Sequence, residues 1–275
     1  MKKIIQIRAS NNMEAMAGVG QHWLEAQEYF KLSQLVGVFL QGSQNYGLEI
    51  PGSDIDTKLI VVPSFKDIAL NKKPVSTTHV RANNEHIDFK DVRLYMETFR
   101  KQNLNFLEIL FTSYSILNKA YSKEWYRLVA AREAIAHMNP WRAVKSMKGV
   151  ALEKYHAMEH EYPSKVDVLA QYGYDPKQLH HLLRIQDYLK RYIDGVPYSI
   201  CLRPTNPEYL KAVKQGLYTL EEAREIADKS IATIVDDADK FCEYYEDKED
   251  AKVRELLEDV QYEIMKIAVQ KELEK

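Results

Sequence analysis

The chain has 275 residues, of which 45% are hydrophobic and 28% are charged, and its formal net charge at pH 7 is −2. This composition excludes a chain that is mainly intrinsically disordered, because disorder requires low hydrophobicity together with high net charge. The near-neutral charge gives the molecule as a whole no electrostatic attraction to nucleic acid. The length predicts one large domain or two domains of moderate size.

The sequence has no run of about 18 apolar residues, so no segment is expected to cross a membrane. Residues 1–6 have a basic start but only two apolar residues, which does not fit a signal peptide. Cys201 and Cys242 lie far apart and form no Cys-x-x-Cys pair. We therefore expect reduced thiols and a cytoplasmic location.

Helix and strand patterns alternate in the first part of the chain. Apolar residues at three- and four-residue spacing predict a helix over residues 10–32. Short apolar runs rich in β-branched residues predict strands over 35–40 and 56–62, and a third strand is expected over 85–89. Asp91 fits the N-cap of a helix whose apolar face carries Val92, Tyr95, Met96 and Phe99.

From residue 125 onward the sequence shows helical periodicity and no convincing strand. Turn signals at residues 139–140, 162–164, 195–197 and 203–204 divide it into five or six predicted helices. The last helix carries the clearest apolar stripe, formed by Val253, Leu256, Leu257, Val260, Ile264 and Ile267. The predicted fold class is therefore α+β, with a small mixed-sheet domain over residues 1–120 and an all-α domain over 121–275.

One segment carries recognisable chemistry. A predicted buried strand ends at Gly42-Ser43, ten turn-rich residues follow, and the next strand opens with Asp54-Ile55-Asp56. Strand alternation places the two carboxylates on one face, about 7 Å apart, where a divalent cation such as Mg²⁺ would relieve their repulsion. Gly42 would let the backbone approach a ligand closely, and Ser43 offers a hydroxyl and an amide to a phosphate oxygen.

Each of these pieces also has an ordinary structural explanation. Gly52, Ser53 and Asp54 form a common turn into a strand, and Asp-x-Asp alone occurs by chance in many proteins. Their occurrence in this order, at the ends of two consecutive strands, favours a metal and phosphate site.

The order of Gly-Ser, a short spacer and Asp-x-Asp resembles the signature of the DNA polymerase β-like nucleotidyltransferase superfamily. The closer similarity is to a branch of predicted nucleotidyltransferases found in bacterial and phage genomes. That branch follows Gly-Ser with Tyr-Gly, here Tyr46-Gly47, and opens the next strand with Ser-Asp-Ile-Asp, here residues 53–56.

The resemblance continues into the second half of the chain and covers about residues 35–235. It includes an acidic strand residue and an Asn-x-x-x-x-Glu segment, then a Gly-Tyr-Asp-x-Lys opening to a helix of His-Leu-x-Arg type. The matching residues are Asp88, Asn103 and Glu108, Gly173 to Lys177, and His181 to Arg184. Gln178 departs from the pattern, which has a histidine there.

The resemblance implies nucleotidyl transfer by two Mg²⁺ ions, or Mn²⁺ in their place, held by three carboxylates. Asp54 and Asp56 are two of these predicted ligands, and Asp88 on the neighbouring strand is our choice for the third. Asp88 could instead be an edge-strand acid in water. Asp91 is better explained as a helix cap, and Asp67 is a weaker candidate.

The second half carries three potentially cationic residues on one helical face, Lys177, His181 and Arg184, at positions i, i+4 and i+7. The resemblance favours a role in binding triphosphate, and the alternative is a solvated basic face. Asp175 fits the N-cap of this helix. Tyr46 could stack on a base or ribose, or simply pack in the core.

The leading hypothesis is an Mg²⁺-dependent nucleotidyltransferase that moves a nucleoside monophosphate from a nucleoside triphosphate, with ATP the expected donor. The acceptor hydroxyl could belong to a transfer RNA, a protein or a small molecule. Two alternatives remain: a non-catalytic nucleotide-binding or partner-binding protein resembling antitoxin-like members of the fold, and a two-metal phosphohydrolase.

Overall fold

The computed structural model describes residues 5–7 and 13–274, and the described residues form two compact units. Unit 1 is built from Met1–Asn45, Gly52–Met138 and Glu249–Lys275, and unit 2 from Tyr46–Pro51 and Asn139–Lys248. Each unit is described separately below.

Unit 1 contains one mixed sheet of six strands in the order β1-β6-β2-β3-β5-β4. The strand bounds are Ile5–Ile7 (β1), Leu35–Gln41 (β2), Asp56–Val61 (β3), Ser76–Val80 (β4), His86–Asp91 (β5) and Ser115–Asn118 (β6). β3 and β5 are parallel, whereas the other neighbouring pairs are antiparallel. β2 lies between β6 and β3, which explains why its residues form a continuous apolar run.

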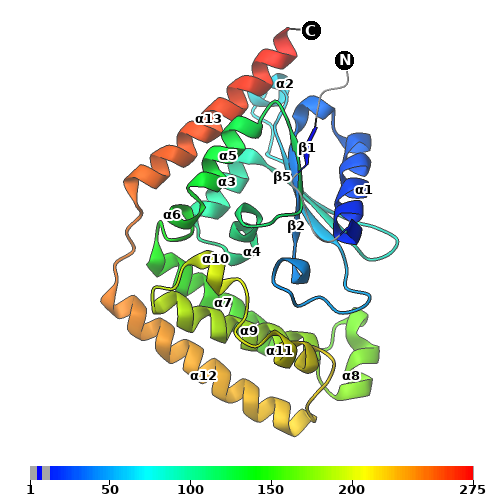
Figure 1. Ribbon diagram of the computed structural model, residues 1–275, viewed down its shortest axis with the longest axis vertical. Helices are drawn as coiled ribbons and strands as arrows, with labels where there is room; N and C mark the ends of the chain where they lie inside the picture. Colours follow the sequence, from blue (N-terminus) through cyan, green and yellow to red (C-terminus); the bar gives the residue numbers. More distant parts are fainter. Residues whose placement is uncertain (1–4, 8–12, 275) are drawn as a thin grey trace. The chain divides into compact units, whose positions relative to one another are not determined.

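Helices cover both faces of this sheet (Figure 1). The helices of unit 1 are α1 (Met13–Tyr29), α2 (Phe65–Ala69), α3 (Val92–Arg100), α4 (Leu104–Leu107), α5 (Ser122–Ala130), α6 (Arg132–Ala136) and α13 (Ala251–Leu273). Helix α1 packs on one face, and α3 and α5 lie on the other, where the rings of Phe39 in β2 and Trp125 in α5 are 4.3 Å apart. The last helix, α13, packs against α3 and α5.

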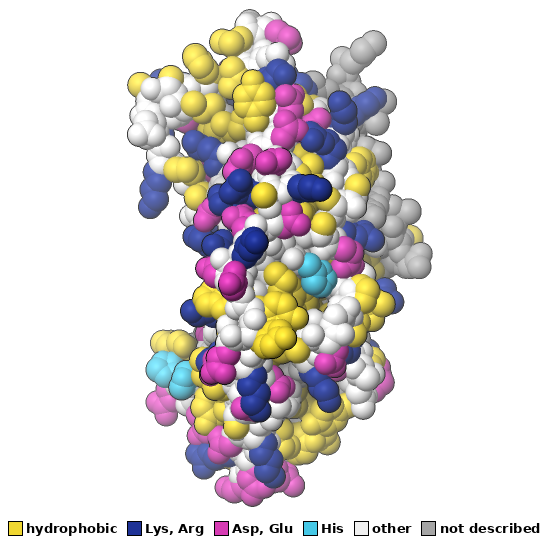
Figure 2. All heavy atoms as spheres, turned by 90° about the vertical axis from the view of Figure 1, so that its left-hand side faces the viewer, with side chains coloured by type: hydrophobic (Ala, Val, Ile, Leu, Met, Phe, Trp, Pro, Cys, Tyr) yellow, Lys and Arg dark blue, Asp and Glu magenta, His cyan; other side chains and the backbone are white. Residues whose placement is uncertain are grey.

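The charged side chains are mixed on the face of the molecule drawn in Figure 2. Lysine and arginine side chains are interspersed there with aspartate and glutamate. This face therefore presents no extended basic surface of the kind that binds a phosphate backbone. No helix within residues 5–7 and 13–274 combines the length and apolar composition needed to cross a membrane.

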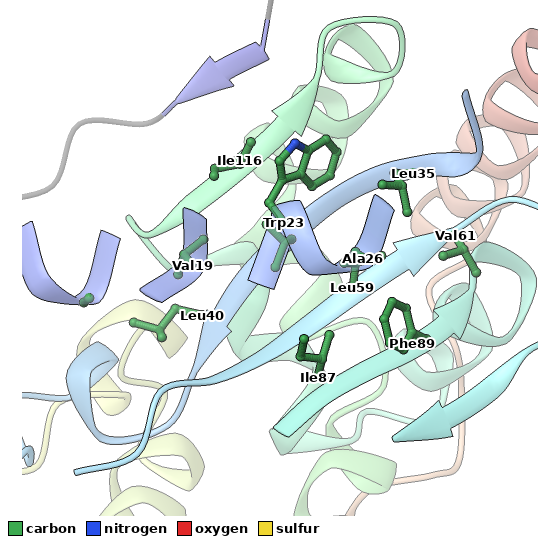
Figure 3. Packing of buried hydrophobic residues seen from close by; sticks show 12 residues of the cluster. Val19, Trp23, Ala26, Leu35, Leu40, Leu59, Val61, Ile87, Phe89 and Ile116 are labelled. Carbon is green, nitrogen blue, oxygen red and sulfur yellow. The ribbon is translucent and has the colours of Figure 1, made fainter. Parts of the chain in front are cut away.

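The core between α1 and the sheet depends on strand alternation. Leu59 and Val61 of β3 and Ile87 and Phe89 of β5 belong to the buried cluster that α1 forms with the sheet (Figure 3). The residues between them on each strand must therefore point to the other face. Because these four apolar residues are buried against α1, the polar residues that alternate with them on β3 and β5 point away from α1.

Unit 2 is helical in its described residues. Its helices are α7 (Pro140–Ala157), α8 (Val166–Tyr172), α9 (Pro176–Ile193), α10 (Tyr198–Cys201), α11 (Pro207–Lys214) and α12 (Leu220–Tyr244). Helix α9 contacts α7, α10, α11 and α12, and this central position explains why most of its apolar residues are buried. Asp175 accepts a hydrogen bond from the backbone N–H of Lys177 at 2.9 Å, which confirms the predicted N-cap.

The α+β class is confirmed, with strands toward the N-terminus and helices after them. The predicted helix over 10–32 is observed from Met13 to Tyr29, while residues 10–12 lie outside the described residues. From residue 122 on, the described residues form nine helices rather than five or six, because α6, α8, α10 and α11 are too short to show separate periodicity.

The two units differ from the division into residues 1–120 and 121–275 predicted from the sequence. Helices α5, α6 and α13 all belong to unit 1, so the chain leaves unit 1 after Met138 and returns at Glu249. The apolar stripe of α13 accounts for the return. Its buried residues, Val253, Leu257, Val260, Ile264 and Ala268, face the helices of unit 1.

Buried His180 makes the stability of unit 2 depend on pH. Its Nδ1 lies 2.8 Å from the carbonyl oxygen of Leu210. Burial, opposed by the hydrogen bond to Leu210 and assisted by the charges of Arg184, Lys214 and Lys177, lowers the pKa of His180 from 6.5 to about 4. The unfolded chain therefore binds the proton more readily, and stability present above about pH 6.5 is lost as the pH falls toward 4.

We expect this single group to remove as much as about 3 kcal/mol of unfolding free energy by pH 4. Urea unfolding at several pH values measures the effect, and His180→Gln should flatten the curve between pH 6.5 and 4. His156→Gln, at an exposed position of α7, is the matched control and should leave the curve unchanged. A wild-type slope that persists in His180→Gln would contradict the assignment.

Candidate functional site

The predicted Gly-Ser motif forms a tight turn at the end of β2. Gly42 has φ of +95°, a conformation that favours glycine, and Ser43 begins a 3₁₀ turn, η2, over Ser43–Asn45. A Cβ at position 42 would meet no atom within 4 Å. Open space beside exposed backbone is what close approach of a ligand requires, so the predicted role of Gly42 fits its geometry.

A buried carboxylate holds this turn in place. The side chain of Glu108, only 4% exposed, accepts a hydrogen bond from the N–H of Gly42 at 3.0 Å. Asn45 donates from its side chain to the carbonyl oxygen of Leu40 at 2.9 Å and accepts from the hydroxyl of Thr112 at 2.6 Å. These bonds come from the protein itself, so the turn is formed before any ligand binds.

The paired acids lie at the same end of the sheet as this turn. Asp56 is the first residue of β3 and pairs with Gln41, the residue before Gly42, in the antiparallel register. Asp54 precedes the strand by two residues and is exposed, and its backbone carbonyl oxygen accepts from the side chain of Gln44 at 3.1 Å. The structure therefore brings together Gly42, Ser43, Asp54 and Asp56 at one end of the β2–β3 pair.

Asp56 has one oxygen engaged and one available. Its Oδ1 accepts from the backbone N–H of His86 at 2.9 Å, and the His86 ring Nδ1 lies 3.0 Å from the same oxygen. Oδ2 of Asp56 and the carboxylate of Asp54 have no hydrogen-bond partner within the described part of the chain. Three oxygens thus remain available from these two residues.

Asp88, the third predicted ligand, has a different environment. Its Oδ2 accepts from Nζ of Lys58 at 2.9 Å, and its Oδ1 accepts from the hydroxyl of Thr78. Burial would raise the pKa of the Asp88 carboxyl, but the charge of Lys58 and the bonds from Thr78 and Lys58 outweigh it and hold the pKa below its ordinary value. Asp88 is therefore an ionised carboxylate whose two oxygens are both occupied.

These contacts decide how well the predicted ligands fit a metal ion. Asp54 and Asp56 supply hard oxygen donors of the type that Mg²⁺ prefers. Asp88 would have to share an oxygen with Lys58 or Thr78. Among the described residues, no group of three or more His, Cys, Asp or Glu side chains is placed to hold a metal ion. The structure thus fits a cation on two of the three predicted ligands.

The predicted residues of unit 2 lie on α9 and on the segment 46–51. The guanidinium of Arg184 stacks over the ring of Tyr46 at 4.2 Å, and both side chains are buried. This contact is a cation–π pair within unit 2, so Tyr46 packs against protein as one of its two interpretations expects. A role for Arg184 in binding triphosphate stays a prediction.

Lys177 and His181 differ in charge. Lys177 is exposed in the first turn of α9. Burial lowers the pKa of His181 well below its ordinary value, and the charges of His180, Arg184 and Lys177 lower it further. His181 is therefore neutral at physiological pH and cannot serve as a cationic phosphate contact, although a neutral imidazole can still accept a proton.

Asp91 caps a helix, as predicted. It is buried at the start of α3, accepts from the backbone N–H of Arg93 at 2.9 Å and forms an ion pair with the Arg93 guanidinium at 2.7 Å. Asp67, the weaker candidate, forms a capping box with Ser64 at the start of α2. Hydrogen bonds from Ser64 and Lys72 lower the pKa of Asp67 to about 2. Both acids are engaged in holding helix ends.

We expect Asp91→Ala to lower the unfolding free energy by about 1–3 kcal/mol and to leave catalytic activity intact, because the cap and the partner of Arg93 are lost. Urea unfolding measures the stability, and an assay of nucleotidyl transfer from a labelled triphosphate measures the activity. Abolished activity at unchanged stability would contradict the cap assignment and would indicate that Asp91, rather than Asp88, is the third cation ligand.

Sequence reasoning missed Lys58 and Thr78, which the structure places beside Asp88, and it named Glu108 as part of the family pattern without a role. The sequence contained a signal for Lys58. It follows Asp54 and Asp56 at the same two-residue spacing and lies inside an apolar strand, where a buried lysine needs a partner of opposite charge. Thr78 lies on an exposed edge strand without apolar alternation, so its pairing with Asp88 left no trace in the sequence.

A scan against models of protein families finds no match for this chain. A search among curated proteins finds no relative either.

Proposed function

We propose that the chain is a divalent-cation-dependent nucleotidyltransferase of the DNA polymerase β-like type, in which an acceptor hydroxyl loses its proton, attacks the α-phosphate of a nucleoside triphosphate and receives the nucleoside monophosphate as pyrophosphate leaves. One observation carries the proposal. A preformed glycine turn with open space beside Gly42 lies at the same end of the β2–β3 pair as two carboxylates with available oxygens. Phosphate binding and cation binding are thereby combined in one short segment.

Each residue of this segment has a definite task. Gly42 leaves space for a phosphate beside the turn, and Ser43 offers its hydroxyl and its backbone amide to a phosphate oxygen. Asp54 and Asp56 hold the cation, with Mg²⁺ as the expected ion and Mn²⁺ as a substitute. When bound, such a cation neutralises the charge of the triphosphate and makes the acceptor hydroxyl more acidic.

Supporting residues keep these groups in position. Glu108 fixes the amide of Gly42, and His86 orients the carboxylate of Asp56 through its backbone N–H. Lys177 of unit 2 is the exposed cation proposed to contact triphosphate. ATP is the proposed donor, and the acceptor is a hydroxyl of a transfer RNA, a protein or a small molecule.

Triphosphates labelled separately at the α- and γ-phosphate, supplied with Mg²⁺ and candidate acceptors, test the proposal. We expect the α-label to join the acceptor. Reactions without acceptor should give no labelled product. Release of γ-labelled inorganic phosphate without transfer would indicate a phosphohydrolase instead. Binding without either product would indicate a nucleotide-binding protein and contradict the proposal.

A further inference from the structure

The contacts of Asp88 lead to a statement about how many cations the proposed site holds. Asp88 lies on β5, directly across from Lys58 of β3 and from Thr78 of β4. Each of these neighbours donates to a different oxygen of the carboxylate. Because backbone pairing on both sides sets these positions, the two contacts are part of the sheet and do not depend on a flexible surface side chain.

Lys58 is buried, and its charge is paired with Asp88. The residue is only 4% exposed, and its Nζ lies 2.9 Å from Asp88 and 4.1 Å from the centre of the Phe106 ring. A buried ammonium is costly unless a carboxylate pairs with it, and breaking such a pair leaves both charges uncompensated. The pair is therefore expected to persist when other ligands bind.

A divalent cation on Asp88 would conflict with this pair. The ion would have to share an oxygen with Lys58 or Thr78, and it would lie close to a positive ammonium in a partly buried place, where charges repel more strongly than in water. Asp54 and Asp56 offer oxygens without this competition, because no hydrogen-bond donor among the described residues contacts Oδ2 of Asp56 or the carboxylate of Asp54.

We infer that Asp88 is not a metal ligand, that Lys58 is its permanent counter-charge, and that the site holds a single divalent cation on Asp54 and Asp56. This inference rests on the proposed function, and it departs from the two-ion arrangement that the family resemblance implies. Asp88 is then a positioning residue, which holds Lys58 and the β3–β5 edge beside Asp56.

Binding of Mn²⁺ alone to the full chain tests the inference without any transfer assay. The loss of the free Mn²⁺ electron paramagnetic resonance signal during a titration counts the ions bound per chain. We expect one ion per wild-type chain, and none at this site in Asp54→Asn. Asp88→Asn should keep one ion, with a dissociation constant changed by no more than about threefold, the influence of one neighbouring charge.

Two further variants complete the test, one to keep the protein folded and one as a matched control. Asp88→Asn leaves Lys58 buried without its partner, so the double variant Lys58→Met/Asp88→Asn removes both charges together and should also bind one ion. Lys90→Met is the matched control. Nζ of Lys90 lies 4.5 Å from the centre of the same Phe106 ring, but the ion pair of Asp88 is formed with Lys58 and not with Lys90. It should bind as the wild type does.

The outcomes separate the two proposals. Two ions per wild-type chain, of which Asp88→Asn removes one, would overturn this inference and leave the proposed function intact. A single ion whose affinity falls tenfold or more in both Asp88→Asn and the double variant would overturn it as well. Absence of any Mn²⁺ binding that depends on Asp54 would overturn the proposed function and this inference together.

Discussion

Asp54→Asn and Asp56→Asn are each expected to lower the rate of nucleotidyl transfer by on the order of 10³-fold or more, because a bound cation supplies several kcal/mol of transition-state stabilisation. Each change keeps the size of the side chain and one oxygen. In Asp56→Asn that oxygen can still accept from the backbone N–H of His86, as Oδ1 does at 2.9 Å in the wild type. Initial rates with labelled triphosphate at saturating Mg²⁺ measure the loss.

Folding should survive both substitutions. Asp54 is exposed and its carboxylate has no partner within the described residues, so replacing it removes repulsion and no stabilising contact. The melting temperature should stay the same or rise slightly. Glu97→Gln, which neutralises an exposed acid of α3, is the matched control and should retain full activity. Normal turnover in either aspartate variant would exclude Asp54 and Asp56 as the cation ligands.

Trp23→Ala is expected to give the largest loss of stability, about 3–5 kcal/mol of unfolding free energy. Trp23 is 2% exposed and is the largest side chain that α1 contributes to the buried cluster with the sheet (Figure 3). Truncation removes this contact and leaves a cavity. Chemical denaturation measured through far-ultraviolet circular dichroism gives the change.

Trp23→Phe serves as the conservative control and should lose roughly 1 kcal/mol, because most of the apolar volume is kept. The same experiment reports on the proposed site. Leu59 faces α1 while Lys58 and Asp56 face away from it, so weaker α1 packing should also loosen β3 and lower Mn²⁺ affinity. A Trp23→Ala protein as stable as wild type would contradict the role of α1 as the cover of this face.

The sequence by itself determined the elements whose signals are local. The apolar run of β2, the alternation of β5 and the periodicity of α3 and α13 depend on residues that are neighbours in the chain, and all four elements are observed. The caps Asp91 and Asp175 were predicted for the same reason, since a cap bonds a backbone N–H two or three residues away.

The same reasoning predicted the core of the candidate site. Gly42-Ser43 and Asp54 to Asp56 flank a hairpin-like connection between consecutive strands, so antiparallel pairing brings them to one end of the sheet. Strands β1, β4 and β6 were missed. β4 is a polar, exposed edge strand, and β1 and β6 have only three and four residues, so none of these patterns distinguishes a strand from a loop.

Only the tertiary structure decided which distant residues complete the site. Glu108 bonds Gly42 from 66 positions away, and Lys58 meets Asp88 across 30 positions. The return of α13 to unit 1 likewise depends on a helix face finding a partner more than a hundred residues earlier in the chain. Strand register and helix packing create these contacts, and since they arise from long-range burial, periodicity along the chain carries no record of them.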